Sequence, residues 1–345
     1  MSEEAGSRNA PQLPPRAQLL KMLTASWISQ ATYAAAKLGL VDLMARSAQS
    51  PGQLAEATGA DANVLYRLLR ALASVGLFAE DETGRFAPTP LGDCLRSDRP
   101  DSVQPLAIMM GEELYQAWGG FLHSVQTGRP AFDHVFEMSF FEYLQKTPHA
   151  GALFDACMAT IHGAESEAVV AAYDFAPCRT VVDVGGGAGS LLTAILQAHP
   201  DLEGVLFDLP EVIQRAQKDM EEAGLRQRCK LVPGSFFASL PSGGDTYLLR
   251  HIIHDWDDEE AGRILENCRK VMPDAARLLI VESVIPPGNE PFVGKILDLN
   301  MLVLSGGQER TLAQFEDLLQ KAGFKLSKVL PTSVMRLSII EAAPR

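Results

Sequence analysis

Cysteines are few and scattered in this sequence of 345 residues. There are five, and none stands in a C-x-x-C pair. An odd and dispersed set favours reduced thiols over a disulfide framework or a zinc site. We therefore expect no metal site, and we expect the cysteines to be small buried apolar residues. They are Cys94, Cys157, Cys178, Cys229 and Cys268.

Long apolar runs are absent as well. No stretch approaches the roughly 20 apolar residues that a membrane-spanning helix needs. The N-terminus has no basic start followed by an apolar segment, which is the pattern of a secretory signal. These two absences predict a soluble, cytoplasmic protein with no membrane partner.

Positive charge is in short supply. The 30 Lys and Arg residues stand against 43 Asp and Glu residues, and the formal net charge is −13. Proteins that bind nucleic acid gain affinity by neutralising phosphates with cations. An acidic chain lacks this contribution unless one face is locally basic, so we expect no nucleic-acid partner.

The chain is too long for one ordinary core, and its segments differ in pattern. Residues 1–16 are polar and proline-dotted, as in a mobile tail. Residues 17–100 and 101–172 have helical patterns, whereas 173–345 alternates short apolar runs with amphipathic stretches. That alternation is typical of an α/β domain with a parallel sheet. We predict, after the tail, a dimerisation domain, a helical linker that contributes to a substrate pocket, and a ligand-binding domain.

The segment 17–100 carries a winged-helix pattern. Residues 19–43 are apolar on more than one face, which indicates a helix buried on several sides or partly by a partner chain. Capping residues and glycines predict two further helices, at 52–58 and 62–75. A short hairpin is predicted over residues 77–87.

A winged helix is either a DNA reader or a dimerisation and lid module. The second of its helices is the one that would enter the major groove of DNA. It carries only Arg67 and Arg70 as cations. The dimerisation module is therefore the favoured interpretation.

A glycine-rich loop follows the first strand of the α/β segment. Val181, Val182 and Val184 predict a buried strand, and the run GGGAG directly after it leads into a helix. A second predicted strand, residues 204–207, ends in Asp208. An acid at this position accepts the ribose hydroxyls of an adenosine. The loop and Asp208 together predict an adenosyl cofactor.

The loop does not match a phosphate site. It lacks the GxGxxG spacing of dinucleotide-binding loops, and no GK[ST] follows it, as a Walker loop requires. S-adenosylmethionine carries a sulfonium and no phosphate, so an acid and a loop of backbone amides and carbonyls suit it. We therefore expect S-adenosylmethionine as the cofactor, bound by Asp183, Gly185, Gly187 and Asp208.

A third group of cofactor contacts is predicted after the third strand, residues 230–233. Gly234, Ser235 and Phe236 follow that strand. An aromatic ring here can pack on the adenine, and Ser235 can offer a hydrogen bond to the adenine edge. The alternative is a pair of core phenylalanines after a turn.

The motifs DVGGGAG, LFDLPEVI, GSFF, LLRHIIHDW, LLIVES and GGQERT occur in that order. Together they resemble the small-molecule O-methyltransferases, which include plant caffeate and flavonoid enzymes, acetylserotonin methyltransferase and bacterial antibiotic-tailoring enzymes. The resemblance covers nearly the whole chain and is strongest to the bacterial members. It implies a Rossmann-like sheet of seven strands, an N-terminal winged-helix dimerisation domain, a homodimer and chemistry without a metal.

The resemblance also implies the catalytic residues. His254 matches the base, Glu282 and Glu309 flank and orient it, and Asp255 helps to hold the site or the substrate. The implied acceptor is a hydroxyl, phenolic by expectation, on a small aromatic or polyketide-like secondary metabolite.

Further positions match residues that bind the cofactor or the acceptor. Arg250 stands where the family has a basic residue touching the cofactor, and His162 falls on a helix position where relatives contact its methionine end. Asn300 and Leu304 fall where relatives touch the acceptor. Ser235 departs from the family, which often has aspartate at that position.

His254 suits the role of base on chemical grounds. A phenol with a pKa of about 10 is a weak nucleophile when neutral, and an imidazole with a pKa of about 6.5 is a suitable base. His254 follows the predicted fourth strand, residues 246–253, and ligands of such sheets bind at the carboxyl ends of strands. Glu282 ends the predicted fifth strand, and a carboxylate on the far ring nitrogen would fix the tautomer. The spacing of His251 from His254 predicts that they point to opposite faces of a strand, so His251 is given no role.

Two other functions remain open at this point. One is a relative of the same fold that binds the cofactor and performs decarboxylation or hydroxylation. The complete set of His254, Glu282 and Glu309 argues against it. The other is a winged-helix regulator that senses a metabolite, and the acidic net charge argues against it.

Overall fold

The computed structural model describes residues 13–334 and 336–345, and for residues 161–164 it describes the helical backbone alone. The chain divides into two units, Met1–Glu112 and Glu113–Arg345. Each unit has its own apolar core. The division falls inside the stretch 101–172, which the sequence predicts as a linker.

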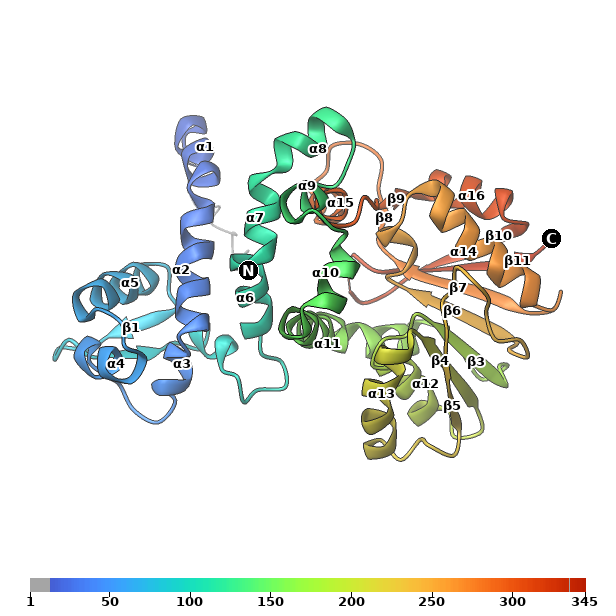
Figure 1. The fold of residues 1–345 in the computed structure, drawn as a ribbon, viewed down its shortest axis with the longest axis horizontal. Helices are drawn as coiled ribbons and strands as arrows, with labels where there is room; N and C mark the ends of the chain where they lie inside the picture. The colour runs from blue at the N-terminus through green and yellow to red at the C-terminus, as the bar shows by residue number, and fades with distance from the viewer. Residues whose placement is uncertain (1–12, 335) are drawn as a thin grey trace, which may run out of the picture. The chain divides into compact units, whose positions relative to one another are not determined.

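The first unit is mostly helical (Figure 1). Its capping residues explain where two of its helices begin, because Ser50 forms a capping box with Gln53 and Asp61 accepts two amide hydrogen bonds. The elements are α1 (Pro15–Leu23), α2 (Ala25–Lys37), α3 (Leu40–Leu43), α4 (Pro51–Thr58), α5 (Ala62–Ser74), β1 (Phe78–Glu80), β2 (Phe86–Pro88), the 3-10 turn η1 (Gly92–Leu95) and α6 (Gln104–Gly111).

The winged-helix pattern is confirmed in this unit. Helices α4 and α5 are followed by the antiparallel pair β1–β2, in which Phe78 lies opposite Pro88. Helix α5 buries one face through Leu65, Leu69 and Leu72, which recur at helical spacing.

The apolar stretch 19–43 does not form one helix, so that prediction is wrong in part. Helix α1 ends at Leu23, and Gly39 takes a left-handed φ of 62° directly before α3. Helix α1 begins at Pro15, inside the segment expected to be a mobile tail, whose residues 1–12 lie outside the described part of the chain. Met22 and Trp27 are each 71% exposed. Their exposure agrees with the expectation that a partner chain covers part of this stretch.

The second unit begins with helices and irregular joins, as predicted. Aromatic rings pack among them, with the centroids of Phe132 and Phe136 4.3 Å apart and those of Phe132 and Phe140 5.1 Å apart. Phe132 and Phe140 are buried and serve as core, whereas Phe136 is only partly buried. The helices are α7 (Glu113–Gly119), α8 (Phe121–Thr127), α9 (Ala131–Phe136), α10 (Phe140–Lys146) and α11 (Pro148–Ala172).

A sheet of seven strands follows, in the order β10-β11-β7-β6-β3-β4-β5. Strands β3 to β7 of this sheet pair in parallel, and β11 runs antiparallel to both β7 and β10. The predicted Rossmann-like α/β fold is confirmed. The strands are β3 (Thr180–Val184), β4 (Glu203–Asp208), β5 (Cys229–Pro233), β6 (Thr246–Arg250), β7 (Arg277–Glu282), β10 (Phe324–Pro331) and β11 (Ser338–Pro344).

Helices cover both faces of this sheet. Figure 1 shows α14 (Asp258–Val271) and α16 (Leu312–Lys321) on one side, and α12 (Ser190–Ala198) and α13 (Pro210–Glu222) on the other. Strands buried on both faces read as continuous apolar runs, which explains why they were recognisable in the sequence. The remaining elements are the 3-10 turn η2 (Ile253–Asp255), helix α15 (Gly294–Leu304) and the short parallel pair β8 (Val284–Ile285) and β9 (Arg310–Thr311).

The fourth predicted strand is shorter than expected. Strand β6 ends at Arg250, and not at Ile253, because His251 adopts a left-handed φ of 53° and turns the chain out of the sheet. The 3-10 turn η2 follows directly. Such a φ is uncommon for a residue other than glycine and is found often at functional sites.

Candidate active site

The carboxyl ends of four neighbouring strands bring the predicted site residues to one edge of the sheet. The glycine loop follows β3, Asp208 ends β4, Arg250 ends β6 and Glu282 ends β7. This edge is where open parallel sheets bind their ligands.

The glycine loop has a backbone that only glycine adopts without strain. Gly185 and Gly187 take φ values of 70° and 59°. A Cβ atom on Gly185 would lie 2.5 Å from Ile252 Cδ1. A Cβ atom on Gly187 would meet no described atom within 4 Å, so the backbone there borders open space. A ligand can approach the loop at Gly187.

Asp208 holds the loop and faces the same region. Its Oδ2 accepts a hydrogen bond of 2.8 Å from the Gly187 amide, and its Oδ1 accepts one of 2.7 Å from the Leu209 amide. Burial raises the pKa of this carboxyl, whereas the two amides lower it. Each carboxylate oxygen retains lone pairs for further donors such as ribose hydroxyls.

Asp183 of β3 and Arg250 of β6 lie at the same edge of the sheet. Burial raises the pKa of Asp183 to about 7, which Arg250 opposes and Asp208 reinforces. The Arg250 guanidinium donates hydrogen bonds to Ser190 at 2.8 Å and to Ser166 at 3.0 Å. The buried carboxyl group of Asp183 and the partly buried one of Asp208, beside an open glycine backbone, suit a cationic ligand better than a phosphate. The residues present therefore fit S-adenosylmethionine.

The predicted adenine contacts lie after β5. A Cβ atom on Gly234 would lie 2.6 Å from the Phe207 ring, so the chain is tightly packed there. Ser235 accepts a hydrogen bond of 3.3 Å from the Phe237 amide, which leaves its hydroxyl proton for another acceptor. Phe236 packs against Phe237, with centroids 4.9 Å apart. Both readings of the phenylalanine pair, core and adenine contact, are compatible with this packing.

His254 is buried among three carboxyl groups. Its Nδ1 lies 2.8 Å from Glu309 Oε1, and its Nε2 lies 3.7 Å from Asp255 Oδ1. Glu282 Oε1 accepts a 3.1 Å hydrogen bond from the His254 backbone amide, and not from the ring. The structure thus brings His254, Glu309, Glu282 and Asp255 together, with Glu309 as the ring partner.

These carboxyl groups make His254 unusually basic. Burial lowers the pKa of His254, but Asp255, the hydrogen bond to Glu309 and the charge of Glu282 outweigh burial and raise it to about 10. Burial raises the pKa of Glu282 to about 7 and that of Asp255 to about 6. Among the described residues, Glu282 Oε2 and Glu309 Oε2 are buried without a hydrogen-bond partner. The charges of these neighbours therefore favour the protonated form of the His254 imidazole.

The prediction for His251 is wrong. Its ring lies 5.1 Å from the His254 ring, on the same side of the chain, because β6 ends before it and its backbone is left-handed. Its Nε2 lies 2.8 Å from Glu165 Oε2, and Arg336 bonds the other oxygen of Glu165. Burial, reinforced by His254, Arg250 and Arg336, lowers the pKa of His251 well below 6.5. A strand-based spacing argument misses this pair, and the sequence carries no other signal for Glu165.

Two predicted acceptor contacts lie on α15. Asn300 Oδ1 accepts a hydrogen bond of 3.0 Å from Trp118 Nε1 of α7, and Leu304 is buried. The roles given to Asn300 and Leu304 stay predictions. His162 lies on α11, and its side chain falls outside the described part of the chain, so its role also stays a prediction.

The residues that the structure describes form neither a metal-binding group nor a membrane-spanning helix. No group of three or more His, Cys, Asp or Glu side chains is placed to hold a metal ion. No described helix is both long enough and apolar enough to cross a membrane. All five cysteines are free thiols.

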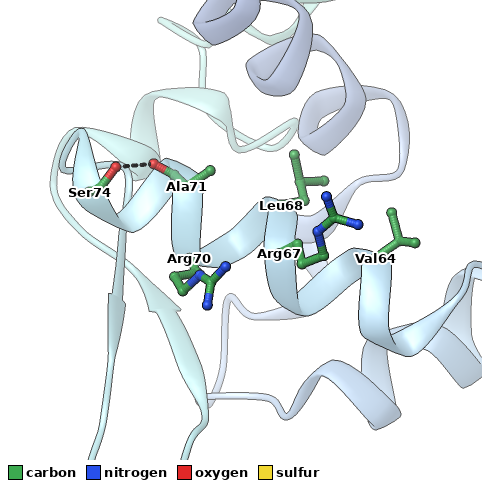
Figure 2. Close-up of a pocket in the computed structure, with 6 residues that line it drawn as sticks. All are labelled: Val64, Arg67, Leu68, Arg70, Ala71 and Ser74. Carbon is green, nitrogen blue, oxygen red and sulfur yellow. Dashed lines mark hydrogen bonds between the residues drawn. The ribbon is translucent and has the colours of Figure 1, made fainter.

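A shallow pocket lies on α5 of the first unit. Figure 2 shows the guanidinium groups of Arg67 and Arg70 on the exposed side of this helix. The Arg70 guanidinium lies 5.4 Å from the centre of the Tyr66 ring. The pocket lining mixes the two cations with small and apolar residues, namely Val64, Leu68, Ala71 and Ser74.

Comparison with known proteins assigns both units. An O-methyltransferase domain matches residues 118–325, and an O-methyltransferase dimerisation domain matches residues 20–98. The phenazine O-methyltransferase PhzM of Lysobacter antibioticus is 49% identical over 338 residues, which are 98% of this chain and 99% of that protein. The phenazine-1-carboxylate N-methyltransferase of Pseudomonas aeruginosa is 32% identical over 334 residues, which are 97% of this chain and 99% of that protein.

A solved structure agrees with these relatives. The O-methyltransferase NcsB1 from neocarzinostatin biosynthesis was crystallised with S-adenosylmethionine and 2-hydroxy-5-methyl naphthoic acid. It matches with a TM-score of 0.85 at 34% identity, over 97% of this chain and 100% of that chain. The dimerisation domain supports a homodimer, and the cofactor is S-adenosylmethionine. The chain belongs to the S-adenosylmethionine-dependent O-methyltransferases of secondary metabolism.

Proposed function

We propose that the protein methylates a phenolic hydroxyl of a small aromatic or polyketide-like compound, with His254 as general base. The observation that carries this proposal is the 2.8 Å contact between His254 Nδ1 and Glu309 Oε1. It leaves Nε2 as the ring nitrogen for the acceptor, because the 3.7 Å separation from Asp255 is longer than a hydrogen bond. A phenazine and a naphthoic acid in the names of similar proteins support a fused-ring acceptor.

The bound cofactor supplies a methyl group on a sulfonium, which is a good leaving group. The residues of the chain have to orient the acceptor oxygen and remove its proton. Nε2 of His254 takes that proton, while Nδ1–H remains bonded to Glu309. Glu309 thereby fixes the tautomer and stabilises the imidazolium that forms.

The basicity of His254 matches that of its proposed substrate. A phenol has an ordinary pKa of about 10, and the carboxyl groups raise the pKa of His254 to about 10. Proton transfer between groups of equal pKa is close to neutral in free energy. An unperturbed imidazole would make the same transfer unfavourable by about 5 kcal/mol. Only the neutral ring accepts the proton, so the raised pKa also means that the competent form becomes more abundant as pH rises.

The remaining predicted residues are proposed to bind the two ligands. The first set, toward the cofactor, is Asp183, Gly185, Gly187, Asp208, Gly234, Ser235, Phe236, Arg250 and His162. Asp255, Asn300 and Leu304 are proposed to contact the acceptor. Asp255 lies nearest to the free ring nitrogen of His254, so it is suited to receive a second polar group of the acceptor.

A methyl-transfer assay with paired acceptors tests this proposal. The purified protein is incubated with S-adenosylmethionine and either a monohydroxylated phenazine or phenazine-1-carboxylate, which has ring nitrogens and no hydroxyl. A hydroxynaphthoate and its methyl ether form a second pair. We expect a product heavier by one methylene group only from the hydroxylated member of a pair.

Other outcomes separate the alternatives. Methylation of phenazine-1-carboxylate on a ring nitrogen, which gives a product that alkali does not hydrolyse as it does a methyl ester, would replace the hydroxyl with nitrogen as acceptor, as the name of the N-methyltransferase relative indicates for that protein. Loss of carbon dioxide or gain of oxygen without methyl transfer would support the decarboxylating or hydroxylating relative. Either result would overturn the proposed O-methylation.

A further inference from the structure

We infer that Arg310 is a positioning residue that sets the His254–Glu309 pair by holding the chain on both sides of it. This inference rests on the proposed role of His254 as base. Arg310 is fully buried, and it has the largest volume of the fully buried side chains among the described residues. A cation in that position needs a reason beyond packing, since an apolar side chain of similar volume fills space at lower cost.

The guanidinium binds the turn that carries His254. Its Nη1 donates a hydrogen bond of 2.9 Å to the Ile253 carbonyl, and its Nη2 donates one of 3.0 Å to the Trp256 carbonyl. These two carbonyls enclose His254 and Asp255 in the sequence. The 3-10 turn η2 is only three residues long and has no helix ladder to fix it. Arg310 supplies that fixation from outside.

The same guanidinium holds the segment that carries Glu309. Nη1 also approaches the Gln308 carbonyl at 3.4 Å. Nε and Nη2 donate to Asp258 Oδ1 at 3.0 and 2.9 Å, and Gln308 Nε2 donates to the same oxygen at 2.8 Å. The residues on either side of Glu309 are therefore anchored to the first turn of α14. The fork of five donors in arginine makes such a set of bonds possible, and lysine cannot reproduce it.

Two backbone features place the segments against each other. A Cβ atom on Gly307 would overlap the His254 carbonyl oxygen, so the two segments touch without an intervening side chain. Arg310 also pairs with Val284 in the β8–β9 ladder, two residues after Glu282. The segments of His254, Glu309 and Glu282 thus meet around one side chain.

Substitution of Arg310 by lysine tests the inference. With S-adenosylmethionine and a monohydroxylated phenazine, or the phenol found active in the paired assay, we expect the kcat of Arg310→Lys to fall about 10- to 100-fold, because a shift of about 1 Å can cost that much. The KM for the phenol and the Kd for the cofactor should change less than about threefold, since the guanidinium does not contact the glycine loop. A looser Glu309 contact also lowers the pKa of His254, so the acid limb of kcat/KM moves to lower pH.

A matched control is available in Arg228. Its guanidinium donates to the carbonyls of Leu196, His199 and Leu202, near the amino-terminal ends of the strands. Arg228→Lys should lower the Tm and leave both kcat and the pH profile unchanged. If Arg310→Lys fails to fold, Asp258→Asn weakens the same anchor from an exposed position and should show a smaller loss of kcat with the same pH shift.

Two results would overturn the inference. One is an Arg310→Lys enzyme with unchanged kcat and pH profile. The other is a loss of kcat no greater than that of Arg228→Lys at an equal loss of Tm. His254→Ala is measured beside these variants. Full turnover in His254→Ala would disprove the base assignment and with it the positioning role of Arg310. Lost turnover in His254→Ala beside an unaffected Arg310→Lys would overturn the role of Arg310 alone.

Discussion

The two buried histidines of this site are three residues apart, and their pKa values are shifted in opposite directions. Carboxyl groups surround His254 and raise its pKa to about 10. His251 contacts the carboxylate of Glu165, which also binds Arg336, and the pKa of His251 lies well below 6.5. Burial acts on both rings in the same direction, so the charges of the neighbours determine the outcome.

The opposite shifts distinguish the imidazole that can act as a base from the one that cannot. A histidine with a low pKa is neutral at pH 7 but accepts a proton weakly. His254 is the stronger base in its neutral form, which becomes abundant as pH rises, and it keeps Glu309 on its far nitrogen to stabilise the cation. His251, with its Nε2 bonded to Glu165, is suited to a structural role beside it.

Replacing each histidine in turn should give the greatest difference in kcat. His254→Ala should lower kcat by at least about 10³-fold, because it removes the base and the partner of Glu309. The Kd for S-adenosylmethionine, measured by calorimetry, should change little. His251→Asn is the matched control, since asparagine tolerates the left-handed backbone, and its kcat should fall less than about tenfold. Equal losses in the two variants would abolish the distinction between the rings.

Removing the charge of Glu309 should bring the pKa of His254 closer to that of His251. Glu309→Gln retains an oxygen near Nδ1 but loses a charge that raises the pKa of His254. We expect kcat to fall about 10- to 100-fold and the acid limb of the kcat/KM profile to move to lower pH. Glu290→Gln, in an exposed loop, is the control. An unmoved limb would show that Glu309 does not set the basicity of His254.

A substitution at Asp208 should change the affinity for S-adenosylmethionine and not the pKa of His254. Asp208→Ala removes the acceptor of the Gly187 amide and the predicted ribose contact, a loss of about 1.5–3 kcal/mol. The Kd for S-adenosylmethionine should rise more than about tenfold, as measured by calorimetry. Asp201→Ala, in the exposed turn before β4, controls for loss of charge. Unchanged affinity in Asp208→Ala would show that Asp208 does not contact the ribose.

Asp183 is expected to act on stability and on cofactor binding, and not on the basicity of His254. Burial raises its pKa from 3.8 to about 7, so its ionisation disfavours the folded state increasingly as pH rises from about 4 to 7, by up to about 4 kcal/mol. Asp183→Asn should raise the Tm of the ligand-free protein by a few degrees at pH 8, less at pH 5, and weaken cofactor binding. Thermal unfolding at both pH values checks this. A Tm gain that does not grow with pH would contradict the assigned ionisation.

Much of the fold was predictable because its signals are local. The valines before the glycine loop, the cap at Asp61 and the acid at the end of β4 each determine a structure within a few residues. Their pattern also indicated the cofactor. The resemblance of the motifs to a known family predicted the grouping of His254, Glu282 and Glu309.

The parts that were missed depend on contacts distant in sequence. The end of β6 at Arg250 follows from one left-handed residue, His251, whose φ no spacing rule predicts. Glu165 and Arg336 reach His251 from α11 and from the loop before β11. Arg310 was visible in the motif GGQERT, but its bonds to Ile253 and Trp256 appear only in the folded chain.

The pH dependence of kcat/KM is the sharpest test of whether His254 is the base. It is measured for the unaltered protein and for His254→Ala, with S-adenosylmethionine saturating and the best phenol from the paired assay. Because the base must be unprotonated, we predict that the rate of the unaltered protein rises with pH and that its acid limb lies well above pH 6.5, toward the raised pKa of His254. The residual rate of His254→Ala should rise only as the free phenol ionises, so the phenol used is one whose own pKa, measured by titration, differs from the acid limb of the unaltered protein. A flat profile in the unaltered protein, or the same limb in both proteins, would show that His254 is not the base.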